Sequence, residues 1–401
     1  MSALGLFEGF GVEIEVMIVD AGTLDARPLT DEVLKAVCGR YDSEVEQGEL
    51  NWSNELVLHV IELKTNGPAG ALEPLADLFH RDLKRVRDYL EPFGARLMPT
   101  GMHPWFDPAR ETRLWPHEYN AVYESYDRIF GCQGHGWSNL QSTHLNLPFR
   151  DDAEFGRLHA AIRLVLPILP ALAASTPLKE GRPTGFLDSR LEVYRTNQRK
   201  IPSLAGRVIP EPVFTRKDYE ALLRTLYKDI APHDPENILQ YEWLNSRGAI
   251  ARFDRNTIEV RVLDTQECAQ ADLAVVAAVT AAVRALAEER WVGLRDQQSW
   301  AVDPLAELFL RTVREAEAAV IDDAAYLGLF GLKRKATAGE LWAHLAETLL
   351  PGGPWTPALG TITGRGTLSR RILGALDAGG TPREVYGRLC DCMDEGKVFV
   401  P

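Results

Sequence analysis

Residues 252–264 read RFDRNTIEVRVLD, and this stretch decides the fold. It alternates as a β-strand does, with Ile258 on an apolar face and Glu259, Arg261 and Leu263 on the other. One face therefore packs on a hydrophobic core, whereas the other places a carboxylate beside a guanidinium, where water or a polar ligand must reach them. A single Glu–Arg pair on a half-exposed strand is weak evidence for a site, so the other strands have to be compared with it.

Glutamates recur on a second strand-like stretch, residues 11–20, which read GVEIEVMIVD. Ile14 and Val16 lie on its apolar face, and Glu13 and Glu15 share the opposite one. Two carboxylates that are two residues apart on one strand face repel each other unless a cation lies between them. The stretch therefore predicts either a solvated strand face or a bound cation.

The third stretch, residues 54–64, contains Glu55 and Glu62. Residues 57–63 are apolar enough for a central strand, so Glu62 lies where burial is costly. Because seven positions separate the two glutamates, a straight strand would place them on opposite faces. Either Glu55 lies in the loop before the strand, or a bulge intervenes.

The fourth stretch, residues 137–149, is predicted to be a strand that ends at a proline. Ser142, His144 and Asn146 share one face, which is unusually polar for a strand. Taken alone, His144 could be a satisfied core histidine. Four strands with acidic or imidazole groups on one face are harder to explain by chance.

Composition and charge are those of a soluble globular protein, with 45% hydrophobic and 25% charged residues among 401. The formal net charge is −13 and no basic block occurs, which argues against a nucleic-acid partner. We find no signal-peptide pattern, and the most apolar helix candidate, residues 273–286, is too short to cross a bilayer. The five cysteines are scattered, so we expect reduced thiols, a cytoplasmic location and no membrane partner.

One short segment gathers positive charge in this acidic chain: Arg190, Arg195, Arg199 and Lys200. Such a cluster could bind an anion, and a charged helix face or helix end explains it equally well. We expect one α+β unit over residues 1–401, because no linker interrupts the chain, with a sheet-bearing core at 1–290 and a helical part at 291–401. Helices are predicted over residues 72–90, 152–174, 214–226, 272–289, 304–320, 338–349, 368–376 and 382–393.

Five carboxylates and one imidazole would meet on a single sheet face only if divalent cations held them together. Hard oxygen ligands at this density suit Mg²⁺ or Mn²⁺ better than zinc, and such ions usually serve phosphates. The sequence contains neither a P-loop nor a G-x-G-x-x-G turn, so a nucleotide such as ATP would bind through metal ions and arginine side chains. The residues concerned are Glu13, Glu15, Glu55, Glu62, Glu259 and His144.

Four motifs, taken in order, resemble those of the glutamate–cysteine ligases and the related carboxylate–amine ligases, which share a sheet with glutamine synthetase. Residues 11–15 match the family's opening G-[IV]-E-x-E strand, and residues 55–65 match its acid-x6-Glu-[FL]-x-T segment. Residues 144–147 resemble its H-x-[NH]-[FLV] strand, and residues 258–264 its [IV]-E-[VI]-R-x-x-D strand. The order and approximate spacing hold across most of residues 6–290, and the helical ending resembles the bacterial carboxylate–amine ligase branch.

The resemblance implies a six-stranded, mainly antiparallel sheet curved into a glutamine synthetase-like funnel, with flanking helices and a helical C-terminal part. It also implies two or three Mg²⁺ ions and a reaction in which ATP phosphorylates the γ-carboxylate of glutamate and an amine then displaces phosphate. By position, Arg261, Glu259 and Arg195 are expected to be catalytic, and Arg190, Arg195 and Arg252 to bind the nucleotide. The expected metal ligands are Glu13, Glu15, Glu55, Glu62, His144 and Glu259.

The acceptor amine, cysteine or another amino compound, stays open, because residues 100–105 and 141–148 depart from the family's pattern where it would bind. Two other functions also stay open. A non-catalytic, regulatory relative would bind metal and nucleotide without turnover. A guanidino-type phosphotransferase is disfavoured because the sequence has no obvious reactive cysteine between acidic neighbours. The expected partners are glutamate, an amine and ATP, and a homodimer is the candidate assembly.

Overall fold

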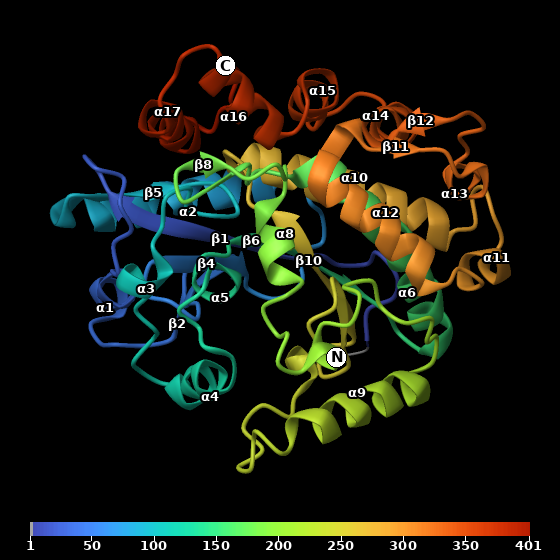
Figure 1. The fold of residues 1–401 in the computed structure, drawn as a ribbon, viewed down its shortest axis with the longest axis horizontal. Helices are drawn as coiled ribbons and strands as arrows, with labels where there is room; N and C mark the ends of the chain where they lie inside the picture. The colour runs from blue at the N-terminus through green and yellow to red at the C-terminus, as the bar shows by residue number, and fades with distance from the viewer. Residues whose placement is uncertain (1–2) are drawn as a thin grey trace.

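The computed structural model describes residues 3–401 and is organised around one eight-stranded sheet whose neighbouring strands are all antiparallel (Figure 1). The strand order is β2-β3-β4-β1-β6-β10-β9, and β5 pairs with the far end of β1. The strands of this sheet are β1 (Gly11–Asp20), β2 (Glu44–Glu46), β3 (Leu50–Asn54), β4 (Val60–Thr65), β5 (Ala95–Met98), β6 (Ser142–Pro148), β9 (Ala249–Arg252) and β10 (Thr257–Asp264). Two short hairpins lie apart from it, formed by β7 (Leu178–Lys179) with β8 (Arg182–Pro183) and by β11 (Val320–Ile321) with β12 (Ala336–Thr337).

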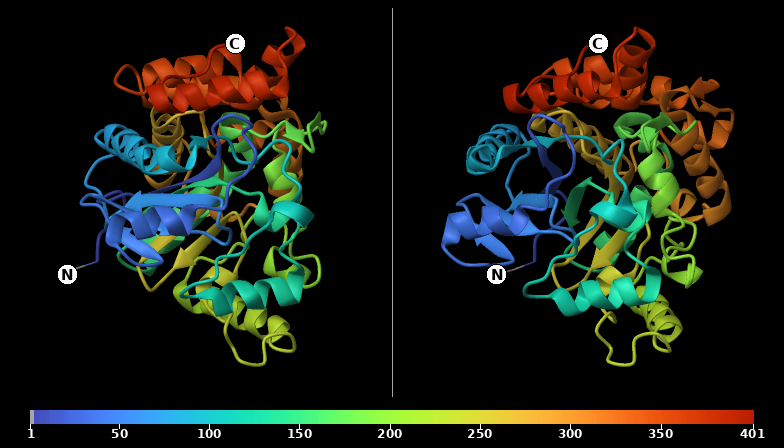
Figure 2. Two further views of the ribbon diagram at one scale, coloured as in Figure 1. Left: turned by 90° about the vertical axis from the view of Figure 1, so that its left-hand side faces the viewer. Right: turned by 60° about the vertical axis from the view of Figure 1, so that its left-hand side comes forward.

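Helices flank the sheet and make up most of the last third of the chain. The longer helices are α1 (Thr30–Cys38), α2 (Leu75–Leu90), α4 (Asn120–Phe130), α6 (Asp152–Val165), α9 (Arg216–Ile230), α10 (Ala269–Ala287), α12 (Val302–Glu315), α14 (Ala338–Leu349), α15 (Thr356–Arg365), α16 (Leu368–Asp377) and α17 (Pro382–Glu395). The shorter ones are α3 (Pro108–Glu111), α5 (His135–Ser138), α7 (Pro170–Ala173), α8 (Ser189–Tyr194), α11 (Leu294–Gln298) and α13 (Ala324–Gly328). Helices α16 and α17 lie at one end of the molecule, and α4 and α9 lie at the other (Figures 1 and 2). The predicted α+β class is confirmed, but the sheet has eight strands instead of six, because the short edge strands β2 and β9 also pair.

The two faces of β1 have different neighbours, as its alternation predicts. Ile14 and Val16 are fully buried in the main hydrophobic core, which also contains side chains of α2, α6 and α10. On the other face, Glu13 and Glu15 are followed by Met17 and Val19, which pack in a second cluster with side chains of α16 and α17. The C-terminal helices therefore cover the continuation of the face that carries the acids.

Residues 252–264 form the end of β9, a turn and β10, and not one strand. Arg252 ends β9, and Asn256 completes the turn into β10 in the left-handed region with a φ of 54°. Between Val260 and Leu263 the register with β6 shifts by one residue, which is a β-bulge. The expectation that Leu263 shares the face of Arg261 is therefore wrong, because beyond the bulge Leu263 joins the main core.

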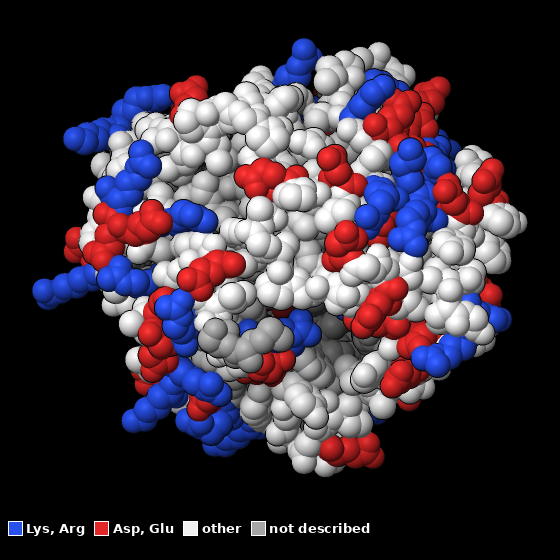
Figure 3. Space-filling model, turned by 180° about the vertical axis from the view of Figure 1, so that it is seen from behind, with Lys and Arg blue, Asp and Glu red and all other residues white. Residues whose placement is uncertain are grey.

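Helix α10 is the most apolar element of the chain. It is 19 residues long and apolar enough to cross a membrane by length and composition, so the expectation that it is too short does not hold. The helix is longer than expected because it begins at Ala269 and continues to Ala287. It packs against α2, α6, α14 and α15, and 83% of its apolar window is buried, which is the environment of a core helix. On the surface seen in Figure 3, acidic and basic side chains are interspersed.

Candidate active site

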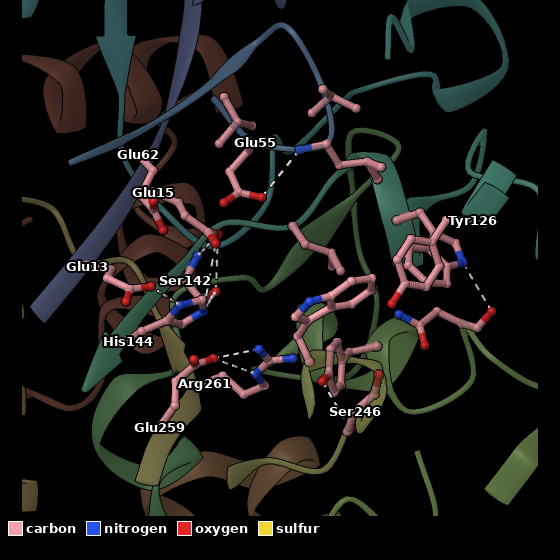
Figure 4. Close-up of a pocket in the computed structure, with 18 of the residues that line it drawn as sticks. Glu13, Glu15, Glu55, Glu62, Tyr126, Ser142, His144, Ser246, Glu259 and Arg261 are labelled. Atoms are coloured by element: carbon pink, nitrogen blue, oxygen red, sulfur yellow. Dashed lines mark hydrogen bonds and ion pairs between the residues drawn. The ribbon is translucent and has the colours of Figure 1, made fainter. Parts of the chain in front are cut away.

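A cavity of about 390 Å³ lies against the polar face of the sheet (Figure 4). Strands β1, β4, β6, β9 and β10 and the loop between β3 and β4 contribute side chains to its wall. All but one of the site residues predicted from the sequence line it: Glu13, Glu15, Glu55, Glu62, His144, Arg190, Arg252, Glu259 and Arg261. Segments far apart in the chain therefore converge on one site.

Strand register brings the acids together. Glu15 lies directly opposite Glu62 on the neighbouring strand β4, and Glu13 lies opposite His144 on β6. Like charges directly opposite each other on a sheet are destabilising. The Glu15–Glu62 pairing is therefore unfavourable unless a proton or a cation separates the two carboxylates.

Glu55 reaches the same site from the loop between β3 and β4. Of the two explanations for its spacing from Glu62, the loop position is the correct one. Burial raises the pKa of Glu55 well above its usual range, and the charges of Glu15 and Glu62 raise it further. Among residues 3–401, no Lys or Arg forms an ion pair with this carboxylate, so its charge has to be balanced from elsewhere.

Two groups of side chains offer ligand atoms that all lie within 4.8 Å of one another. The first consists of Glu13, Glu62 and His144, and the second of Glu15, Glu55 and Glu62. Glu62 belongs to both. The donors are mainly carboxylate oxygens, which fit Mg²⁺ or Mn²⁺, and a carboxylate shared between two groups is suited to two neighbouring ions.

In the metal-free protein, protons and a lysine balance part of this charge. Burial and the charges of Glu13 and Glu15 raise the pKa of Glu62 to about 7, although Lys64, with Nζ 3.1 Å from Oε2, opposes the shift. Burial disfavours the charged form of His144, but its 2.9 Å hydrogen bond to Glu13 and the charge of Glu15 raise its pKa to about 9. Metal binding at this site would therefore displace protons.

Hydrogen bonds hold two of the acids in place. The main-chain N–H and the hydroxyl of Ser142 donate to Oε2 of Glu15 at 2.7 and 3.1 Å. The hydroxyl of Ser53, on β3, donates to Oε2 of Glu62 at 2.6 Å. Partners of this kind fix the orientation of potential ligands before an ion binds.

Glu259 stands apart from both ligand groups, because two arginines neutralise it. Arg261 donates to its Oε1 through Nε and Nη2 at 3.0 and 2.5 Å, and Arg252 donates to its Oε2 through Nη1 at 3.2 Å. Burial disfavours the charged forms of both Arg261 and Glu259. Their mutual attraction nevertheless raises the pKa of Arg261 and lowers that of Glu259. The Glu–Arg pair seen in the sequence is thus a half-buried ion pair in the wall of the cavity.

Three of the four basic residues between 190 and 200 already have partners within the protein. Arg195 is not among the residues that line the cavity, because Glu192, three positions earlier on α8, accepts hydrogen bonds from its Nε and Nη2, both at 2.7 Å. Lys200 donates to the carbonyl of Ile129. Arg190 does reach the cavity, but its buried guanidinium donates through Nε to Asp264. The alternative of a charged helix end is correct for Arg195.

Five aromatic residues that line the cavity were not predicted from the sequence. Tyr123 and Tyr126 come from α4, Trp137 from α5, Tyr194 from α8 and Trp243 from a single turn at Glu242–Leu244. Tyr123, Tyr126 and Phe130 recur at helix spacing, but this spacing does not distinguish the two tyrosines that line the cavity from Phe130, which packs behind them. Lys64 was also missed, although it lies two positions after Glu62 on the same strand face.

A second cavity of about 430 Å³ adjoins the first. Glu13, Lys64 and Arg255 line both cavities. The second cavity is lined partly by apolar residues, including Phe10 and Pro68, and partly by polar ones. Its other polar lining residues include Asn51, Asn146 and Asn256.

The fold is that of the glutamate–cysteine ligases. A glutamate–cysteine ligase from Francisella tularensis, solved in complex with AMP, superposes with a TM-score of 0.59 at 11% identity over 96% of this chain and 88% of that one. A bifunctional glutathione synthetase from Pasteurella multocida gives a TM-score of 0.61 at 14% identity, covering 98% of this chain and 52% of that one. At these identities the likeness concerns the fold alone.

The family model named "Glutamate-cysteine ligase family 2(GCS2)" matches residues 9–351, and the chain belongs to this family. An uncharacterized protein of Archaeoglobus fulgidus is 36% identical over 262 residues, which are 65% of this chain and 70% of that protein. A Rubrobacter xylanophilus protein, provisionally named glutamate–cysteine ligase 2-1, is 29% identical over 64% of this chain and 61% of its own length. The chain thus spans less than two thirds of that named relative.

Proposed function

We propose that the protein is an ATP- and Mg²⁺-dependent ligase that joins the γ-carboxylate of glutamate to an amine. The observation that carries this proposal is the pair of ligand groups that share Glu62. An anionic substrate and a nucleotide would bind beside them, where Arg261 and Lys64 also face the cavity. Membership in the glutamate–cysteine ligase family supports the same reaction class.

The proposed chemistry has two steps. An oxygen of the γ-carboxylate attacks the γ-phosphorus of ATP, the bond to the bridging oxygen breaks, and ADP leaves. The amine nitrogen then attacks the acyl carbon, phosphate leaves with the bonding electrons of the C–O bond, and the nitrogen loses a proton. Bound Mg²⁺ would neutralise the phosphate charge, and the protein's contribution is to position the reactants.

The proposed roles follow the geometry. Glu13, Glu15, Glu55, Glu62 and His144 are the proposed metal ligands, because their ligand atoms form the two groups. Glu259 is the proposed orienting partner of Arg261, and it is a further metal ligand only if a bound ion draws it away from the arginines. Arg261 would hold a substrate carboxylate or the transferred phosphoryl group, since its planar guanidinium suits both.

The second cavity is the proposed location of the nucleotide. It shares Glu13, Lys64 and Arg255 with the first cavity, so phosphates that reach these groups would lie beside the ligand atoms. Arg252 contacts Glu259 at the same end of the first cavity, which keeps it a candidate for binding ATP. Phe10 and Pro68 offer apolar surface for the base.

The experiment that tests the function is a coupled measurement of ADP release with Mg²⁺, ATP, glutamate and a panel of amines. We expect ADP and phosphate only when donor and acceptor are both present. Glu259→Gln should lower this rate by about a hundredfold, because Arg261 loses the carboxylate that orients it. Glu8→Gln, which alters an exposed ion pair with Arg150, is the matched control.

Other outcomes would support other functions. Release of pyrophosphate would contradict the proposal. ATP binding by calorimetry without turnover would support the non-catalytic relative, and a stable phosphorylated guanidine would support a phosphotransferase.

We further propose that residues 1–401 act as one cytoplasmic unit. Met17 and Val19 of β1 pack with side chains of α16 and α17, which joins the helical C-terminal part to the strand that bears Glu13 and Glu15. Limited proteolysis tests the single unit, which should resist cleavage between residues 290 and 300. A homodimer stays a prediction, for light scattering to test.

A further inference from the structure

The cavity has two chemically different halves (Figure 4). The sheet supplies the acids, and Tyr126 lies on the opposite side from Glu13 and Glu15. Five aromatic side chains line the cavity, and we call them the aromatic wall: Tyr123, Tyr126, Trp137, Tyr194 and Trp243. These rings pack on the main hydrophobic core, and the surface that they present to the cavity is available to an apolar part of a substrate.

Three rings of the aromatic wall are in contact, and Tyr241 extends them to the solvent. The ring of Tyr126 lies 5.0 Å from that of Trp137 and 6.0 Å from that of Trp243, measured between centroids. Tyr241 stacks on Trp243 at 5.5 Å with an interplanar angle of 12°, and 58% of its surface is exposed. A ligand can therefore contact aromatic surface from the mouth of the cavity inward.

Positive charge is scarce on this side. Arg261 is the cation that adjoins Tyr126 and Tyr194, and it already donates two hydrogen bonds to Glu259. The other polar lining groups near the wall include the neutral side chains of Asn197 and Ser246. The remaining cations that line the cavity are each paired with an acid: Lys64, Arg190, Arg252 and Arg255.

A carboxylate bound against the aromatic wall would thus compete with Glu259 for Arg261 or remain unpaired, and an unpaired buried carboxylate is costly. An ammonium group bound at the same place would instead be stabilised. Aromatic faces attract cations, and the acids across the cavity draw the same charge inward. The wall therefore selects for an amine and against an amino acid.

We propose that the acceptor is a primary amine with an aromatic or bulky apolar group and without a carboxylate. Its nitrogen points toward the acids and its apolar body packs on Tyr126, Trp137 and Trp243. This inference rests on the proposed ligase function and names its acceptor class. Because the acceptor lacks the carboxylate, Arg261 stays available to the donor or to the phosphoryl group.

The test compares matched acceptors that differ only in the carboxylate: phenethylamine with phenylalanine, tyramine with tyrosine, and cysteamine with cysteine. ADP release is measured with glutamate and Mg²⁺-ATP at saturation. We expect kcat/KM to be higher for each amine than for its amino acid, and highest for the aromatic amines. A preference for cysteine over cysteamine and phenethylamine would overturn the inference and leave the ligase function intact.

Trp243→Ala tests the wall itself. The variant should lower kcat/KM for phenethylamine by about tenfold or more, and for methylamine by less, because only the larger amine loses apolar contact. Phe93→Ala removes a partly exposed ring outside the cavity lining and is the matched control. If Trp243→Ala instead weakens ATP binding in calorimetry, the wall holds the base of the nucleotide and the inference is wrong.

Calorimetry separates the two proposals when no acceptor supports turnover. The wild-type protein is titrated with phenethylamine in the presence of Mg²⁺ and a non-hydrolysable ATP analogue. Binding that is lost in Trp243→Ala would support the acceptor class while the ligase reaction fails. Absence of phenethylamine binding would reject the acceptor class as well.

Discussion

Glu62 is the residue that the two ligand groups share, and its surroundings disfavour a second negative charge. It lies opposite Glu15 in the sheet, and its pKa is raised to about 7. Ser53 and Lys64 hold its Oε2, which leaves Oε1 to face other ligands. A bound ion at this carboxylate would stabilise the folded protein, because the unfolded chain cannot form the site.

Removal of Glu62 should therefore abolish the stabilisation by metal. For the wild-type protein we expect Mg²⁺ at about 100 times its Kd to raise the free energy of unfolding by about 2–3 kcal/mol. Glu62→Gln should lose most of this increase, whereas Glu46→Gln, on the exposed face of β2, should keep it. Thermal unfolding with Mg²⁺ and with EDTA measures both. If Mg²⁺ stabilised the wild-type protein and both variants equally, Glu62 would not be a metal ligand.

We expect His159 to contribute to the loss of stability at acid pH. It is fully buried on α6 beside Phe155, and burial together with the charge of Arg163 lowers its pKa to about 3. The unfolded chain takes up this proton near pH 6.5, whereas the folded protein does not. The free energy of unfolding should therefore fall as the pH falls from 6.5 toward 3.

His159 alone should change the free energy of unfolding by about 1.4 kcal/mol per pH unit in this range. His159→Phe should make the decrease shallower by that amount, because the variant has no proton to bind. Urea unfolding between pH 4.5 and 7 measures the slope. An unchanged slope would show that His159 is not the group responsible.

At the scale of elements, the hairpin of β9 and β10 sets the distance between Arg252 and Glu259. Asn256 closes this turn with a positive φ of 54°, and its carbonyl accepts a hydrogen bond from the main-chain N–H of Phe149 on the neighbouring chain segment. Asn tolerates the left-handed region better than most residues, and β-branched residues tolerate it worst.

Asn256→Val should consequently lower the free energy of unfolding by about 1–2 kcal/mol. Asn256→Gly, which accepts the same backbone angle, is the control and should change it by only a few tenths of a kcal/mol. Denaturation in urea at constant pH measures both variants. Equal free energies of unfolding for the valine and glycine variants would show that residue 256 does not require the left-handed conformation.

Several elements were predictable from the sequence because their patterns are local. The alternation around Ile14 gave β1, and the helical period after Ala338 gave α14, whose first turn carries a capping box of Thr337 and Glu340. The bulge at Val260–Leu263 was not predictable, since it depends on the partner strand β6. The position of Glu55 in a loop was one of two explanations that its spacing allowed.

The candidate site was predictable where acids break an apolar strand and unpredictable where no pattern marks a residue. Glu13 and Glu15 repel each other in any strand, which the sequence alone reveals. The role expected for Arg195 from its position in the family's pattern stays a prediction, and the sequence did not reveal that Glu192 on the same helix accepts its hydrogen bonds. Trp243 was missed because a contact with Tyr126, which is distant from it in the sequence, brings it into the site.

At the scale of the whole molecule, a buried ion pair ties the C-terminal helices to the sheet. Arg371 on α16 donates through Nη1 to Glu267, which lies between β10 and α10, and both side chains are almost fully buried. The carbonyl of Phe399 also accepts from this Nη1, and its N–H donates to Glu267 at 3.1 Å. Three distant parts of the chain meet at this point.

Arg371→Met should destabilise the protein by about 3–5 kcal/mol, because it leaves the Glu267 carboxylate buried without its partner. The double variant Arg371→Met, Glu267→Gln should recover part of the loss, since the buried charge is then removed from both sides. Urea unfolding of the two variants measures the difference. Equal stability of the single and the double variant would show that the charge is balanced elsewhere.

The contact of Phe399 with Glu267 couples the helical part of the chain to the strand that carries Glu259 and Arg261. The main-chain N–H of Phe399 donates to Glu267, three positions beyond the end of β10. A substitution near Phe399 that displaces its main chain would therefore loosen the anchorage of β10, although Phe399 does not line the cavity. A loss of activity in such a variant would reflect a displaced strand and not a missing substrate contact.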